Sequence, residues 1–184
     1  MPCDMLYEGN FATFLAGNRG LYISRAMEAL RALPKTDLCD TSHLYETYPM
    51  HITDQPNFFN AAVKIQTALP PHTLLQMLKD TEKRVGRTAG VQFGPRVLDL
   101  DILFYGNEVV ETDGLVIPHP RLHTREFVLS PLMDMCSELR HPRLGESVSS
   151  LYDSLLTDLY GPRPAAKSQF NQRQNHVHPA STIK

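Results

Sequence analysis

The stretch FGPRVLDLDILFYG, residues 93–106, decides how the rest of the chain is interpreted. Val97 to Tyr105 is the clearest strand pattern in the sequence, because β-forming residues continue until the turn signal Gly106-Asn107. Successive side chains of a strand point to opposite faces, so Asp99 and Asp101 share one face and the apolar residues beside them share the other. The stretch therefore predicts a sheet with one apolar face and one acidic face.

The two aspartates are candidate metal ligands. Residues two apart in a strand have Cα atoms roughly 6.5 Å apart, which lets two carboxylates hold one or two hard cations between them. Magnesium suits such a pair, because it takes one or two protein carboxylates and fills its other positions with water and phosphate oxygens. Aspartate is also depleted in strands. The alternative is a strand whose solvated face carries acids, and the pair alone does not decide between the two.

Basic residues flank the acidic pair on both sides. Arg87 and Arg96 precede the strand, with Gly94-Pro95 immediately before Arg96, and further basic residues follow it at His119, Arg121, His123 and Arg125. Carboxylates for metal beside arginine and histidine for phosphate oxygens are the parts that phosphoryl transfer needs. Taken singly, each basic residue is better explained as a solvated surface charge. The sequence has neither a GxxxxGK[ST] nor a GxGxxG motif, so metal and side chains would have to hold the phosphates.

Composition indicates one ordinary domain and excludes several classes of protein. The chain has 184 residues with 42% hydrophobic content, and its 18 basic and 20 acidic residues nearly balance, which argues against nucleic-acid or membrane binding. Three widely spaced cysteines favour a reducing compartment over a disulfide framework or a zinc site. Because no clear transit peptide is present, we expect a cytoplasmic protein, with a mitochondrial location as the alternative. Residues 11–160 form the expected domain, and residues 161–184, polar and aperiodic, are expected to be a disordered tail or linker.

The remaining periodicities predict an α+β fold with an antiparallel or mixed sheet and helices packed on its faces. Strands are expected at 11–16, 39–48, 58–67 and 97–105, and the last of these is expected to form a hairpin with a short strand at 108–111. Helices are expected at about 23–33, 70–86 and 148–160, with a further helix at 124–135 that Pro131 breaks.

Five segments of the sequence, in their order along the chain, resemble the 6-hydroxymethyl-7,8-dihydropterin pyrophosphokinase family. The sequences of the middle segments are closest to the fungal versions. The segments are LYETYPM (44–50), DQPNFFNAAV (54–63), EKRVGR (82–87), FGPRVLDLDILFYG (93–106) and IPHPRLHTREFVLSPL (117–132). The resemblance implies a ferredoxin-like fold. It also implies transfer of pyrophosphate from ATP to 6-hydroxymethyl-7,8-dihydropterin with release of AMP, in tetrahydrofolate biosynthesis. In relatives the domain is often fused to dihydropteroate synthase, which is therefore a candidate partner.

The resemblance also implies a role for individual residues. Asp99 and Asp101 would bind two Mg²⁺ ions. The residues implied at ATP are Glu82, Arg87, Arg96, His119 and Arg125. The four basic ones would neutralise the phosphate oxygens, with Arg87 and Arg96 also catalytic, and Glu82 would lie near the nucleotide. The residues implied at the pterin are Thr47, Tyr48, Met50, Phe58, Asn60 and Phe127, where the phenylalanines would sandwich the ring and Asn60 would bind its polar edge. Without the resemblance, core packing explains the phenylalanines and a structural hydrogen bond explains Asn60 equally well.

The sequence departs from the family pattern in three places. The first strand is followed by FLAGNRG, which is about three residues shorter than the usual turn, and the basic loop between Gly86 and Arg96 is about one residue short. Gly114 replaces an arginine that often precedes the IPH motif. The shortened first turn and the polar tail motivate a second hypothesis, a catalytically weak docking module for the next enzyme of the pathway. A third hypothesis, a metal-dependent nuclease, leaves Phe58, Asn60 and Phe127 unexplained.

Overall fold

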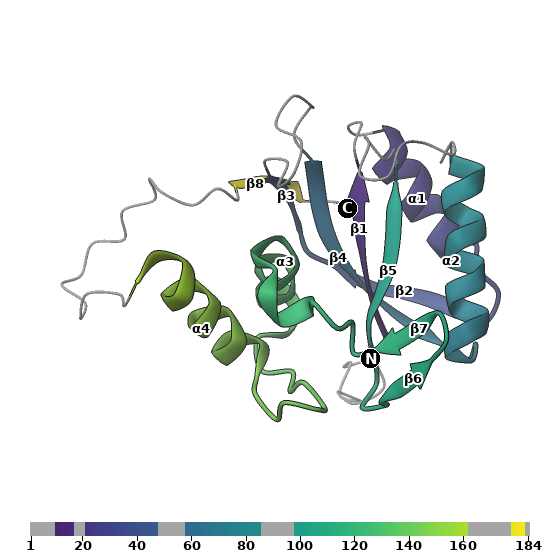
Figure 1. Cartoon of the computed structure of the whole chain (residues 1–184). Helices are drawn as coiled ribbons and strands as arrows, with labels where there is room; N and C mark the ends of the chain where they lie inside the picture. Colours follow the sequence, from purple (N-terminus) through teal and green to yellow (C-terminus); the bar gives the residue numbers. More distant parts are fainter. Residues whose placement is uncertain (1–9, 17–20, 48–57, 86–97, 162–177, 183–184) are drawn as a thin grey trace, which may run out of the picture.

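The computed structural model describes residues 10–16, 21–47, 58–85, 98–161 and 178–182. Its centre is an antiparallel sheet in the order β5-β1-β4-β3-β8, with β2 also paired to β4. The strands are β1 (Asn10–Ala16), β2 (Thr36–Thr41), β3 (His43–Thr47), β4 (Phe58–Thr67), β5 (Asp99–Tyr105) and β8 (His178–Thr182). The helices are α1 (Leu21–Arg31), α2 (Pro71–Val85), α3 (Glu126–Cys136) and α4 (Val148–Tyr160). The predicted α+β class, with helices on both faces of an antiparallel sheet, is confirmed (Figure 1).

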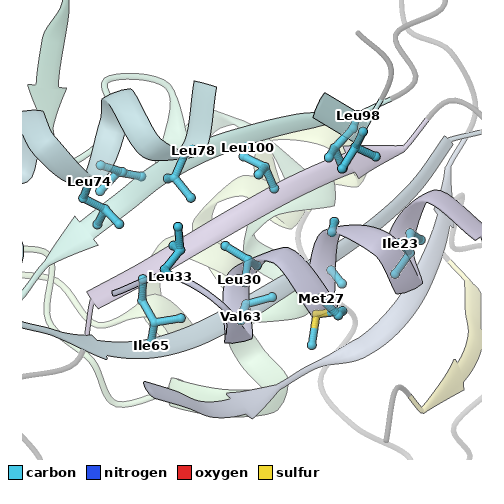
Figure 2. Packing of buried hydrophobic residues seen from close by; sticks show 14 of the residues in the cluster. Ile23, Met27, Leu30, Leu33, Val63, Ile65, Leu74, Leu78, Leu98 and Leu100 are labelled. Carbon is cyan, nitrogen blue, oxygen red and sulfur yellow. The ribbon is translucent and has the colours of Figure 1, made fainter. Parts of the chain in front are cut away.

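The face of the sheet that α1 and α2 cover is a continuous apolar core. Figure 2 shows leucine, isoleucine, valine and methionine side chains from both helices meeting those of β4 and β5. Leu30 on α1, Leu78 on α2 and Leu100 on β5 are each fully buried there. The apolar residues of both helices recur every three or four positions, so one stripe of each helix contacts the sheet. This core fixes the side of the sheet to which Leu100 and Ile102 of β5 point, whereas Phe104, beyond a register shift in the β1–β5 pairing, lies in the core of the opposite face.

The opposite face of the sheet is covered by α3 and α4 (Figure 1). Its apolar core gathers Phe104, Leu122, Leu129, Leu132 and Val148, all 0% exposed. Helix α4 begins at Ser147, whose hydroxyl accepts the Ser150 N–H (3.1 Å), an N-cap that leaves one fewer backbone donor unsatisfied. This second core lies towards one end of β5, and the two aspartates lie beyond it towards the start of that strand.

The strand predicted at 39–48 is two strands, because the chain is irregular at Ser42. Ser42 N–H donates to Ala62 O (2.9 Å), and the Ser42 hydroxyl in turn accepts the Ala62 N–H (2.9 Å). A side chain thus replaces a backbone acceptor of the ladder, so β2 and β3 both pair with β4 but are not continuous. Because of this break, β3 is a separate strand that begins at His43 and ends at Thr47.

The hairpin predicted between 97–105 and 108–111 is wrong in its pairing. Strand β6 (Val110–Thr112) pairs with β7 (Leu115–Ile117) in a separate two-stranded sheet, and not with β5. Asp113 and Gly114 form the two-residue connection, and Gly114 has a φ of +88°, which residues with a side chain rarely adopt. Gly114, one of the departures from the family pattern, is therefore required by the local backbone.

One further expectation differs from the structure. Helix α3 continues through Pro131, although a proline removes one helical hydrogen bond, because Val128, Leu129 and Leu132 around it are buried in the second core. Residues 178–182 of the expected tail form β8, which pairs with β3, and most of the tail lies outside the described residues, so the domain bounds and the disordered tail stay predictions. Within the described ranges, no helix is both long and apolar enough to cross a membrane.

Candidate active site

The strand register places the pterin and metal candidates in one row of the sheet. Leu15 of β1 pairs with Asn60 of β4 on one side and with Asp99 of β5 on the other. Directly paired residues point to the same face, and strands are about 4.8 Å apart, so the Cα atoms of Asn60 and Asp99 are roughly 10 Å apart on the same face. Asp101 lies on this face one row further along, paired with Thr13. The carboxylates and the amide therefore share one surface of the sheet.

The acidic pair is only partly open to solvent and is contacted by a lysine from α2. The side chain of Asp99 is 10% exposed and that of Asp101 is 32% exposed. Lys79 Nζ lies 3.6 Å from Asp99 Oδ1 and 3.5 Å from Asp101 Oδ1. Burial alone lowers the pKa of Lys79, but the carboxylates of Asp101, Glu82 and Asp99 together raise it above its ordinary value. Lys79 is therefore a charged counter-ion of both aspartates.

Glu82 is fully buried and supports β5 from its outer edge. Its Oε1 accepts the Leu100 N–H (2.6 Å) and a hydrogen bond from Lys79 Nζ (2.7 Å). Burial raises the pKa of the Glu82 carboxyl, while the lysine and the amide favour its charged form. Lys79 also donates to Leu100 O (2.9 Å), so the two side chains together satisfy the backbone of the residue that separates the aspartates. Glu82 acts here on the strand; its predicted contact with ATP stays a prediction.

His119 is positioned beside β5 by a backbone hydrogen bond from its own N–H to Leu103 O (2.9 Å). Its pKa is lowered, first by burial and then by Arg125 and Arg121, against the opposing effect of Asp101. Its Nδ1 accepts the Arg121 N–H (3.2 Å), which makes Nε2 the protonated nitrogen of the neutral ring. His119 is thus a neutral donor close to the acidic pair, suited to an anionic oxygen.

Arg125 and Phe127 lie at the start of α3, on the same side of the sheet as the aspartates. The guanidinium carbon of Arg125 is 5.5 Å from the centroid of the Phe127 ring, and Phe127 packs at the edge of the second core. Burial, and then the charge of Arg121, lower the pKa of Arg125, while Asp101 and Asp99 oppose this shift. The arginine predicted at the phosphates and one of the aromatic residues predicted at the pterin are therefore neighbours.

Asn60 and Thr47 form a buried polar pair at the end of β3. Asn60 is 0% exposed and donates from Nδ2 to Thr47 Oγ1 (2.7 Å). Within the described residues, Asn60 Oδ1 has no hydrogen-bond partner. A buried amide atom without a partner costs about 1–3 kcal/mol, and the cost remains if the amide is flipped, because Thr47 satisfies only one of the two atoms. The buried polar atom suits a ligand that brings its own hydrogen-bonding edge.

The metal expectation was tested against the residues around the acidic pair. Among the described residues, no group of three or more histidine, cysteine or acidic side chains forms a metal cluster. Two carboxylates without further protein ligands suit magnesium, which keeps water and phosphate oxygens in its other positions, better than zinc or calcium. Asp99 and Asp101 fit a magnesium site that is completed by a phosphorylated substrate.

Several predicted site residues fall outside the described part of the chain. These are Tyr48, Met50, Arg87 and Arg96, together with the turn at 17–20 and most of the basic loop. Phe58 begins β4, but its side chain is not described. The structure brings together Asp99, Asp101, His119 and Arg125, and separately Asn60 and Thr47. Sequence reasoning missed Lys79; its spacing of three residues before Glu82 on an expected helix was the available signal.

Comparison with known proteins decides the family. The model of the family described as 7,8-dihydro-6-hydroxymethylpterin-pyrophosphokinase (HPPK) matches residues 14–137. This range includes Asp99 and Asp101 together with Lys79 and Glu82. The chain belongs to this family. One relative is the 2-amino-4-hydroxy-6-hydroxymethyldihydropteridine pyrophosphokinase of Bacillus subtilis. It is 41% identical over 123 residues, which cover 67% of this chain and 74% of the relative. The suspected resemblance to HPPK is confirmed.

Other HPPK relatives are parts of much longer proteins. The mitochondrial folate synthesis bifunctional protein of Arabidopsis thaliana is 51% identical over 123 residues, covering 66% of this chain and 22% of the relative. The folic acid synthesis protein fol1 of Pneumocystis carinii is 43% identical over 140 residues, covering 76% and 19%. This chain therefore spans about a fifth of the length of these two relatives. The HPPK-DHPS structure of Plasmodium falciparum with pteroate matches with a TM-score of 0.66 at 17% identity, covering 83% of this chain and 44% of that one, which supports the fold.

Proposed function

We propose that this chain transfers the terminal pyrophosphoryl group of ATP to the hydroxymethyl oxygen of 6-hydroxymethyl-7,8-dihydropterin, giving the pterin diphosphate and AMP. The observation that carries the proposal is the row of the sheet that holds both Asn60 and Asp99 on one face. An acceptor bound at Asn60 and a triphosphate bound at Asp99 lie about two strand spacings apart. That separation suits two substrates that must meet between the two residues.

Asp99 and Asp101 would hold the magnesium ions, two of which are expected. Bound magnesium would neutralise the charge that builds up on the triphosphate oxygens during transfer. His119 would donate from Nε2 to a phosphate oxygen, and Arg125 would add an adjacent positive charge. Because phosphoryl transfer depends mainly on positioning and charge neutralisation, these four side chains supply the chemistry that the described residues can offer. Arg87 and Arg96 remain predicted contributors to the same site.

Asn60 supports the pterin as acceptor. Its unpartnered amide oxygen lies in a fully buried position, and its amide nitrogen is held by Thr47. A pterin carries donors and acceptors along one flat edge, so it can satisfy a buried amide oxygen that no described residue satisfies. Phe127 offers a flat aromatic face for the same ring. A nucleotide-only enzyme leaves this buried amide unexplained.

The test is a direct assay of the proposed reaction. The protein is incubated with ATP, magnesium and 6-hydroxymethyl-7,8-dihydropterin, and AMP is followed by phosphorus NMR. AMP should form only when all three are present, and replacing the pterin by water should leave ATP intact. AMP no higher than in a control without protein would refute the proposal, and binding of both substrates without turnover would favour the docking-module alternative.

The partner and the location are proposals of the same kind. Relatives named as bifunctional folate synthesis proteins, and the solved HPPK-DHPS chains, support dihydropteroate synthase as a fused or docked partner of this domain. A cytoplasmic location is proposed from the reduced cysteines. The mitochondrial names of the Arabidopsis thaliana and Pisum sativum relatives support the alternative.

A further inference from the structure

Lys79 contacts both Asp99 and Asp101, although its helix, α2, covers the opposite face of the sheet. Among the described residues, β5 is the last strand on its side of the sheet, so no described strand pairs with its outer edge. Lys79 extends from α2 along this edge and donates to Leu100 O (2.9 Å), with both aspartates 3.5–3.6 Å away. Its side chain is 31% exposed, so solvent only partly screens the interaction. The ammonium group therefore lies against the carboxylates proposed to bind magnesium.

A second lysine on the same helix provides the comparison. Lys83 lies one turn further along α2, is 66% exposed, and contacts Asp80 (3.1 Å), which is also on the helix surface. Such exposed pairs contribute little. Lys79 instead contacts three carboxylates, those of Glu82, Asp99 and Asp101, of which Glu82 is fully buried. A lysine serving helix stability alone needs only the Glu82 contact, so the two aspartate contacts require a different explanation.

We propose that Lys79 is a built-in counter-cation of the metal site, which binds Asp99 and Asp101 until magnesium enters and releases them when it does. Glu82 and Leu100 O hold the ammonium group at the edge of β5, so it shifts away from the aspartates without leaving the site. Lys79 is thus a positioning residue: its charge offsets the repulsion between the two carboxylates and holds them close together, at the cost of weakening metal binding in the absence of nucleotide. This proposal rests on the assignment of Asp99 and Asp101 as metal ligands.

The first test measures metal affinity and not activity. Mn²⁺ replaces Mg²⁺, and free Mn²⁺ is counted by electron paramagnetic resonance in nucleotide-free wild type, Lys79→Gln, Lys83→Gln and Asp101→Asn. Removing a unit charge this close to two ligands is expected to tighten Mn²⁺ binding by about three- to thirtyfold in Lys79→Gln. Lys83→Gln, which removes the same charge from the same helix, should match wild type.

The outcomes separate the two proposals. If Asp101→Asn weakens Mn²⁺ binding but Lys79→Gln binds no more tightly than wild type, the role of Lys79 is refuted and the metal assignment stands. If Asp101→Asn binds Mn²⁺ as tightly as wild type, the metal assignment fails and the inference fails with it. Circular dichroism melting of each variant shows whether it is folded.

A measurement on the wild-type chain covers the case in which Lys79→Gln does not fold. Lysines are labelled with acetic anhydride with and without saturating Mg²⁺, and the labelling rates at Lys79 and Lys83 are read by peptide mass spectrometry. If magnesium displaces the ammonium group from the aspartates, acetylation of Lys79 should accelerate severalfold while that of Lys83 is unchanged. An equal or slower rate at Lys79 would contradict the proposal.

Discussion

The two faces of the sheet are built from the same strands but stabilised in different ways. On the α1 and α2 face, Leu100 meets Leu30 and Leu78 in a core formed by apolar contact alone. On the other face, Asp99 and Asp101 depend on Lys79, which extends around the edge of the sheet from the first face. Burying charge is costly unless a partner is present, so the acidic face needs residues from distant parts of the chain. Substitutions on the two faces should therefore fail differently, one in function and the other in stability.

The largest expected effect is on activity, from Asp101→Asn on the acidic face. The change keeps the size of the side chain and removes one charged ligand, so turnover should fall by about a hundredfold to a thousandfold or more. The melting temperature should change little, because the Asp101 side chain is 32% exposed. Steady-state rates of AMP formation and a thermal melt test both parts. Wild-type turnover in this variant would exclude Asp101 as a metal ligand.

The next effect is on stability, from Leu30→Ala on the apolar face. Leu30 is fully buried, and truncating such a leucine costs about 2–5 kcal/mol of unfolding free energy. Turnover per folded molecule should stay close to wild type, because Leu30 points away from the face that holds the aspartates. Urea unfolding gives the free energy, and the assay is run well below the melting temperature. A large loss of turnover in folded protein would show that the two faces are coupled.

Asn60→Ala sharpens the comparison within the site. It removes the buried amide proposed to bind the pterin, so the dissociation constant of the pterin should rise by about ten- to a hundredfold, equivalent to 1–3 kcal/mol. Metal affinity should not change, because Asn60 lies two strands from Asp99. Calorimetric titration measures both. Gln66→Ala, at an exposed position of the same strand, is the matched control and should bind the pterin like wild type.

The apolar face was more predictable from sequence than the acidic face. Period-two alternation in β5 placed Leu100 and Asp99 on opposite faces, and periodicity of three to four found α1 and α2, because both patterns are local. The register that aligns Asn60 with Asp99 is set by pairing across β1, and the contact from Lys79 is set by where α2 packs; neither leaves a local pattern. The pairing of β6 with β7 was missed for a different reason: its signal, the two-residue connection Asp113-Gly114, is local, but sequence reasoning paired the short strand with β5 instead. Local sequence predicted the elements, and the distant pairings were determined by packing.

The smallest expected effect concerns pH and a histidine buried on the second face. His141 is 5% exposed, packs edge-on against Phe104, and accepts the N–H groups of Arg143 and Leu144 at Nδ1 (both 3.3 Å). Its pKa is lowered, first by burial and then by His123 and Arg143. The unfolded chain therefore takes up a proton at the ordinary pKa of about 6.5 while the folded chain resists, so this contribution to stability is complete above that pH and lost below it.

Asn at position 141 keeps an acceptor for the same backbone N–H groups but does not titrate. The fall in melting temperature between about pH 7.5 and about pH 5.5 should therefore be smaller in His141→Asn than in wild type. His72→Asn, at an exposed position of α2, controls for the loss of a histidine as such. An equal fall in wild type and His141→Asn would mean that protonation of His141 is not resisted by folding. In that case the folded chain would neither desolvate the His141 ring nor need Nδ1 as the acceptor that holds the 141–144 turn.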